Sequence, residues 1–84
     1  MSEMETRIAV VAIIVEDSDS AVAINSLLHE YSTFIIGRMG IPYPSKNVSL
    51  ISVAIDAPLD VISALTGKLG RVNGVTVKTA YSKM

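Results

Sequence analysis

Few groups of residues in this chain could do chemistry, and the densest of them is one acidic segment, Glu16-Asp17-Ser18-Asp19. Carboxylate oxygens bind hard cations such as Ca²⁺, but this segment lacks the glycine and the ligand spacing of a calcium loop. Acids and serines directly before an amphipathic run also cap helices, because their oxygens accept hydrogen bonds from free backbone N–H groups and their charge suits the helix dipole. We therefore favour a helix cap over a metal site at this segment.

His29 is the single histidine, and the chain has no cysteine. Metal centres of the zinc type need three or four ligands, which these two counts do not supply. A Ser-His-Asp arrangement cannot be argued either, because His29 has no identifiable partners in the sequence. We expect His29 to be a surface residue near a helix end, and we predict no metal, no cofactor, no catalytic residue and no enzymatic activity.

Arg38 is a lone cation in an otherwise apolar stretch, and Gly37 and Gly40 lie close to it. A guanidinium can bind a carboxylate or a phosphate of a small ligand through two parallel hydrogen bonds. Arg38 could equally pair with an acid of a neighbouring subunit or mark a solvated strand edge. The surrounding Gly-Arg-Met-Gly is not a phosphate loop, because its glycines do not open a helix.

The composition is that of a small, nearly neutral chain: 84 residues, 50% of them hydrophobic, with a net charge of −1. The basic field that nucleic-acid binding normally requires is absent. The longest apolar run is well short of the roughly 20 residues that cross a bilayer. We expect a cytoplasmic protein with no nucleic-acid or membrane partner, in which 1–6 is a flexible N-terminal tail and 7–84 is one domain.

The element that must organise the fold is Arg7–Val15, in which eight apolar and mostly β-branched residues follow an arginine. Such a run predicts a strand, and because neither of its alternating faces is polar, a central strand covered on both sides. The order that follows is β-α-β-β-α-β, which predicts an α+β, ferredoxin-like sandwich: a four-stranded antiparallel sheet with two helices on one face and the first and third strands central. The other strands are expected at 34–41, 48–55 and 75–81, the helices at 21–31 and 56–70, and a proline-rich turn at 42–47.

Glycines mark the expected irregularities. Gly37 and Gly40 are costly inside a strand and suggest a bulge or a close backbone approach there. Asp56 is expected near the cap of the second helix, and Gly70 at its C-terminal cap. Gly67 lies inside that helix, where we expect it to permit close packing on a neighbour rather than to act as a hinge.

The apolar first strand also bears on assembly. Two helices cover only one face of the sheet, and an antiparallel sheet with a solvated face normally shows alternating polar residues. A large exposed apolar face favours association. We predict a homodimer or homotetramer in which another copy covers the sheet or pairs with its edge. The alternative is a monomer with an unusually apolar sheet.

Two features resemble ACT-type regulatory domains. One is the hydrophobic first strand that ends in an acidic turn, and the other is Leu-Gly-Arg-Val-Asn-Gly-Val-Thr-Val at 69–77. The first loop departs from the usual ACT pattern because it lacks the Pro-Gly that often follows the acid.

A narrower resemblance covers nearly the whole chain from Met4 onward. The segments 8–16, 28–31, 56–58 and 64–69, and most specifically Ile-Gly-Arg-Met-Gly-Ile-Pro-Tyr at 36–43, are similar to a small bacterial family of iron-only hydrogenase system regulators. Members are standalone ACT-like domains, similar in fold to the C-terminal domain of nickel-responsive repressors. Nickel and DNA binding are not implied, because the chain has one histidine, no cysteine and no DNA-binding N-terminal segment.

This resemblance implies a small oligomeric regulatory or sensor module that binds a small molecule or a partner protein in an iron-only hydrogenase system. Ligands of such modules often sit between subunits near the first loop. By that resemblance Glu16, Asp17 and Ser18 are candidate ligand-binding residues, with Arg38 as an anion contact. The alternative is a non-catalytic structural interaction module, whose apolar sheet and Tyr43 loop dock a protein partner without a small ligand.

Overall fold

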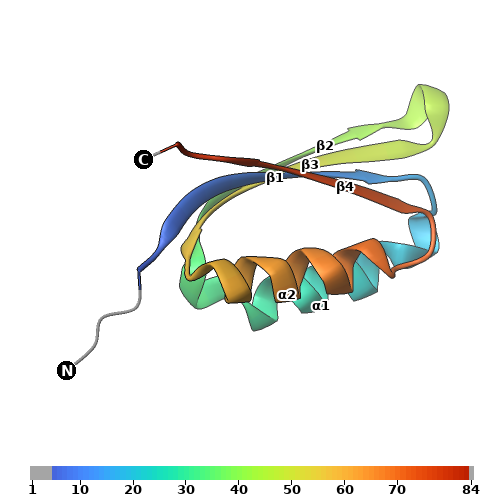
Figure 1. The fold of residues 1–84 in the computed structure, drawn as a ribbon. Helices are drawn as coiled ribbons and strands as arrows, with labels where there is room; N and C mark the ends of the chain where they lie inside the picture. Colours follow the sequence, from blue (N-terminus) through green and yellow to red (C-terminus); the bar gives the residue numbers. More distant parts are fainter. Residues whose placement is uncertain (1–4, 84) are drawn as a thin grey trace.

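β1 (Arg7–Val15) lies in the middle of the sheet in the computed structural model, which describes residues 5–83. The sheet has the order β2-β3-β1-β4, and every neighbouring pair is antiparallel. Both helices lie on one face of it (Figure 1), so the predicted α+β ferredoxin-like fold is confirmed. The remaining elements are η1 (Ser18–Ser20), α1 (Ala21–Glu30), η2 (Ser32–Phe34), β2 (Ile35–Tyr43), η3 (Pro44–Lys46), β3 (Val48–Ala57), α2 (Leu59–Gly70) and β4 (Val75–Tyr81).

The sequence predicts a flexible N-terminal tail at 1–6 and a single domain over 7–84. The first four residues and Met84 lie outside the described residues. Glu5 and Thr6 precede β1 without regular secondary structure. Among residues 5–83, neither helix combines the length and the apolar character that a membrane crossing would need.

Two strands are longer than the sequence pattern predicts. β2 continues through Pro42 to Tyr43, which an edge strand tolerates because the missing proline N–H takes nothing from a central ladder. β3 continues to Ala57, since Asp56 pairs with Ile8 of β1. The expected cap at Asp56 is therefore wrong: α2 begins at Leu59, and its cap position is Pro58, which makes no side-chain capping bond.

The expectations for the glycines had mixed outcomes. A register shift between Ile35 and Gly37 confirms the bulge in β2. Gly67 does not pack closely on a neighbour, because a Cβ built on it meets no atom within 4 Å. Gly70 is the last residue of α2 rather than its cap, and the cap position is Arg71 with right-handed backbone angles.

The core lies between the sheet and the helices. Along β1 the burial alternates, and Ala9, Val11, Ile13 and Val15 are the buried set. They pack with buried residues of β3 and of the two helices. Each large aliphatic side chain buried here contributes about 1.5–3 kcal/mol relative to an exposed one. The other members of the core are Ile24, Leu28, Val53, Ile55, Ala57, Ile62, Leu65 and Leu69.

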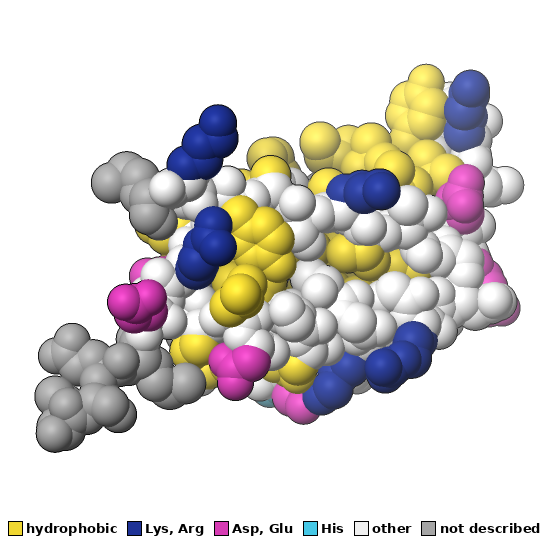
Figure 2. Space-filling model, in the orientation of Figure 1, with side chains coloured by type: hydrophobic (Ala, Val, Ile, Leu, Met, Phe, Trp, Pro, Cys, Tyr) yellow, Lys and Arg dark blue, Asp and Glu magenta, His cyan; other side chains and the backbone are white. Residues whose placement is uncertain are grey.

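The opposite face of the sheet, here called the open face, carries no helix. On β1 it presents Ile8 and Val10, which are 51% and 44% exposed. Cross-strand pairing adds Leu50 of β3 and Ile41 of β2 to the same face. Figure 2 shows hydrophobic side chains gathered over the β2–β3 end of the sheet. The prediction of an apolar sheet face without helices is thus confirmed for the single chain.

Candidate functional site

A cleft of about 890 Å³ opens between α1 and the hairpin formed by β2 and β3. The hairpin extends past the helices (Figure 1), so the sheet surface beneath its outer part is left uncovered. Val15, Ile24 and Ile51 contribute apolar lining, while Gly40 and Ala21 leave room. The volume falls within the range of about 300–1,000 Å³ that is usual for small-molecule sites.

The hairpin keeps its shape through its turn. η3 begins at Pro44, whose carbonyl accepts a hydrogen bond from the Asn47 N–H at 3.2 Å. Asn47 adopts a left-handed conformation with φ of 55°, which asparagine tolerates better than most side chains. Pro42 and Pro44 both line the cleft, and neither offers an N–H to a further strand.

The acidic loop forms one end of the cleft. Asp17 acts as a cap, but of η1 rather than of the amphipathic helix for which the sequence predicted one: its Oδ1 accepts a hydrogen bond from the Asp19 N–H at 2.9 Å. Its Oδ2 accepts from Asn73 Nδ2 at 3.3 Å. This capped turn is a short 3-10 segment before α1, and the cap position of α1 itself, Ser20, makes no side-chain capping bond.

The α2–β4 turn holds this loop in place. The Glu16 N–H donates to the Gly74 carbonyl at 2.8 Å, and the Ser20 hydroxyl donates to the Asn73 carbonyl. Gly74 has φ of 71°, and a Cβ built on it would lie 2.7 Å from the Cβ of Asp17. A side chain at position 74 would clash with Asp17, so Asn73 and Gly74 set the position of the acidic loop, whereas the sequence pattern indicated only a turn there. The Asn-Gly pair was the available signal.

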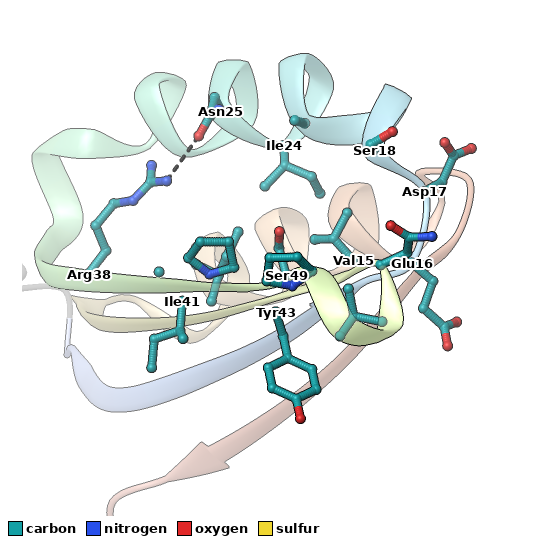
Figure 3. Close-up of a pocket in the computed structure, with 17 residues that line it drawn as sticks. Val15, Glu16, Asp17, Ser18, Ile24, Asn25, Arg38, Ile41, Tyr43 and Ser49 are labelled. Atoms are coloured by element: carbon teal, nitrogen blue, oxygen red, sulfur yellow. Dashed lines mark hydrogen bonds between the residues drawn. The ribbon is translucent and has the colours of Figure 1, made fainter.

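Arg38 forms the other end of the cleft. Its Nη2 donates to Asn25 Oδ1 of α1 at 2.9 Å (Figure 3). The bulge decides this placement: because the register shifts between Ile35 and Gly37, Arg38 pairs with the buried Val53 and shares its helix-facing side. Without the extra residue the alternation would place Arg38 on the open face.

Charge at the cleft is divided between its two ends. Figure 3 shows Arg38 at one end, Glu16 and Asp17 at the other, and Ile24 between them. Within the described range the one ion pair joins Lys68 Nζ to Glu30 Oε2 at 3.2 Å, so Arg38 has no carboxylate partner there. The Tyr31 side chain and the Glu30 carboxylate hold the pKa of Lys68 above its ordinary value, but this pair lies away from the cleft.

All four sequence-derived candidates, Glu16, Asp17, Ser18 and Arg38, line this one cleft. Asn25 was missed, because nothing in the sequence pairs it with Arg38. His29 is exposed on α1 and does not line the cleft. Among residues 5–83 no three His, Cys, Asp or Glu side chains lie close enough together to hold a metal ion.

Comparison with known families gives a match over residues 7–79 to the TM1266-like family, described as "Iron-only hydrogenase system regulator, putative". The chain belongs to this family. A solved structure of uncharacterized protein TM1266 from Thermotoga maritima is 36% identical and superposes with a TM-score of 0.90, covering 94% of this chain and 100% of that one. No curated protein matches the chain. The family resemblance inferred from the sequence is confirmed.

Proposed function

We propose that this protein is a regulatory module that senses a small molecule in the cleft between α1 and the β2–β3 hairpin. The observation that carries the proposal is the cleft itself, which brings Arg38 and the Glu16–Ser18 loop to opposite ends of one apolar-lined space. The family description as a regulator of an iron-only hydrogenase system supports a role in control of such a system. Among the described residues that line the cleft, no serine or tyrosine hydroxyl is hydrogen-bonded to a base that could activate it, so binding suits the cleft better than nucleophilic chemistry.

The proposal includes an ACT-like homodimer or homotetramer in the cytoplasm, with the open face buried between copies. Its support is the exposure of large apolar side chains on that face: Ile8, Val10 and Leu50 are all more than 40% exposed in the single chain. A shallow hollow of about 230 Å³ lies on the same face, floored by Ala12 and Ser52. Burying such a face would stabilise the assembly by about 25 cal/mol for each Å² of apolar surface removed from water.

The cleft and the open-face hollow share part of their walls. Ile41 and Ile51 line both spaces, because β2 and β3 separate them by the thickness of one sheet. A ligand in the cleft would therefore contact the strands that form the assembly surface. This arrangement supports a module in which ligand occupancy and association influence each other, as two linked equilibria must.

Native mass spectrometry of protein purified without added ligand tests the proposal, because it reads assembly mass and any retained molecule together. We expect an oligomer, with extra mass that is released on denaturation. Val10→Glu should shift the assembly to monomer, because it places a charge on the open face. Val22→Glu is the matched control, since Val22 is 76% exposed on α1 and away from that face. A wild-type monomer at micromolar concentration would refute the assembly part.

The second candidate is a structural interaction module that docks a protein partner and binds no small ligand. The open face favours it, since an apolar surface of this kind fits another protein as well as another copy. Partner capture by wild-type protein, lost in Val10→Glu and retained in Arg38→Ala, would support this candidate. Loss in Arg38→Ala together with release of a small molecule would instead support the sensor.

A further inference from the structure

We infer that the cleft selects an anion with an apolar body, in which a carboxylate or phosphate head group binds Arg38 and the apolar part lies toward Ile24 and Ile51. This inference rests on the proposed function and names the ligand class of the same site. It follows from how the charged groups at the two ends of the cleft are used.

At the acidic end, the Asp17 carboxylate already accepts hydrogen bonds from other groups of the protein. Both carboxylate oxygens of Asp17 accept hydrogen bonds, one from the Asp19 N–H at 2.9 Å and one from Asn73 Nδ2 at 3.3 Å. Glu16 points away from the space beside Ile24 (Figure 3). An ammonium group in the cleft would therefore meet no carboxylate that is both free and directed inward.

The basic end is in the opposite condition. Arg38 points toward α1, and within residues 5–83 its one hydrogen bond to a side chain is to the neutral amide oxygen of Asn25, at 2.9 Å. Asn25 thus orients the guanidinium without neutralising it. A guanidinium has five N–H donors, so donors remain for a carboxylate or a phosphate that accepts two hydrogen bonds at once.

Between the two ends the cleft carries apolar side chains that an uncharged ligand body can contact. Figure 3 shows Ile24 and Ser49 between Arg38 and the acidic loop, and Val15, Ala21, Gly40 and Ile51 are further apolar residues of the lining. A ligand that carried a second charge in this middle region would lose hydration without gaining a partner. A single anionic head on an apolar body matches Arg38 at one end and the apolar side chains between the ends.

A series of probes with one branched aliphatic body and four head groups tests this. The probes are 4-methylpentanoate, its amide, leucine (the 2-amino derivative of the same acid) and 3-methylbutyl phosphate. Each is titrated into isotopically labelled protein, and binding is read from the backbone amide shifts of Gly40 and Ser49, which line the cleft, against those of His29, which does not. We expect the two anions to bind more tightly than the amide and at least as tightly as leucine.

The variant Arg38→Gln should weaken binding of the anions about tenfold to a hundredfold and leave the amide unchanged, as expected for loss of a charge-assisted hydrogen bond. Lys78→Gln is the control for net charge, because Lys78 is exposed on β4 and lies outside the cleft lining. It should leave all four affinities unchanged. A preference between the carboxylate and the phosphate identifies which head group the site takes.

The outcomes separate the inference from the proposed function. Equal affinity of acid and amide, an unchanged anion affinity in Arg38→Gln, or tenfold tighter leucine binding would overturn the anion inference while a small-molecule site remained. Failure of all four probes to bind at millimolar concentration would overturn the small-molecule site and the inference together.

Discussion

Replacing Gly74 with alanine should destabilise the protein by about 2–4 kcal/mol, although the residue is exposed and lies in a turn. The reason is the close approach of this turn to the acidic loop. A Cβ at position 74 would lie 2.7 Å from the Cβ and 3.2 Å from the backbone N of Asp17. The φ of 71° adds a conformational penalty for any L side chain.

The magnitude has three parts. The left-handed conformation costs about 1–2 kcal/mol for alanine. Relief of the contact must move the loop, which puts at risk the 2.8 Å bond from the Glu16 N–H to the Gly74 carbonyl and the 3.3 Å bond between Asn73 and Asp17. Each such bond contributes about 0.5–1.5 kcal/mol. The smaller conformational freedom of unfolded alanine returns about 0.4–1 kcal/mol.

Urea unfolding followed by circular dichroism at one fixed protein concentration measures this free energy, and the concentration must be held because association would shift the midpoint. Gly67→Ala is the matched control. Gly67 lies inside α2 with no atom within 4 Å of a built Cβ, so the same substitution should stabilise the protein by about 1 kcal/mol there. The same glycine-to-alanine substitution should thus lower the stability of the protein at Gly74 and raise it at Gly67.

The double variant Asp17→Gly/Gly74→Ala separates contact from conformation. Removing the Asp17 Cβ relieves part of the steric overlap but not the φ penalty, so the two changes should cost less together than the sum of the single variants, by about 1 kcal/mol. Gly74→Ala unfolding at the wild-type urea midpoint would refute the packing argument. Strict additivity in the double variant would refute its steric part.

Two further predictions concern the core and pH. Leu65→Ala should lower the free energy of unfolding in urea by about 2–5 kcal/mol, because Leu65 is fully buried. Leu59 is 49% exposed, so Leu59→Ala should change that free energy by no more than about 0.5 kcal/mol. Similar losses at both sites would contradict the assigned core. Because Tyr31 and Glu30 raise the pKa of Lys68 above its ordinary value of 10.5, the stability that Lys68 provides should be fully present below that pH and be lost as pH rises through the raised pKa. The melting temperatures of wild-type protein and Lys68→Met should therefore converge in alkali, and a gap that widened there would show the opposite sign of coupling.

The sequence predicted most of the fold because hydrophobic periodicity reports burial directly. A strand apolar on both faces could only be central, and β1 is central. Boundaries were less predictable where two signals competed. Asp56 and Pro58 read as a helix start, yet the ladder to β1 extended the strand through Ala57, because pairing with a neighbouring strand outweighs a capping preference.

The candidate site was only partly accessible from the sequence. The acids and Arg38 were evident as residue types, and the family pattern at 36–43 marked the second strand. That Arg38 faces α1 depends on the bulge between Ile35 and Gly37, since one extra residue exchanges the two faces of the strand beyond it. Glycines suggested a bulge without fixing where the register shifts.

By itself, then, the sequence determined which segments are apolar enough to form the core, in what order the elements follow, and which family the chain resembles. Tertiary structure alone decided that Arg38 meets Asn25, that Asp17 is held by the Asn73–Gly74 turn, and that both ends enclose one cleft. The physical reason is that hydrophobicity is a property of each side chain, which the local sequence records. A cleft depends instead on how distant segments are placed, and their register and crossing are set only when the whole sheet has formed.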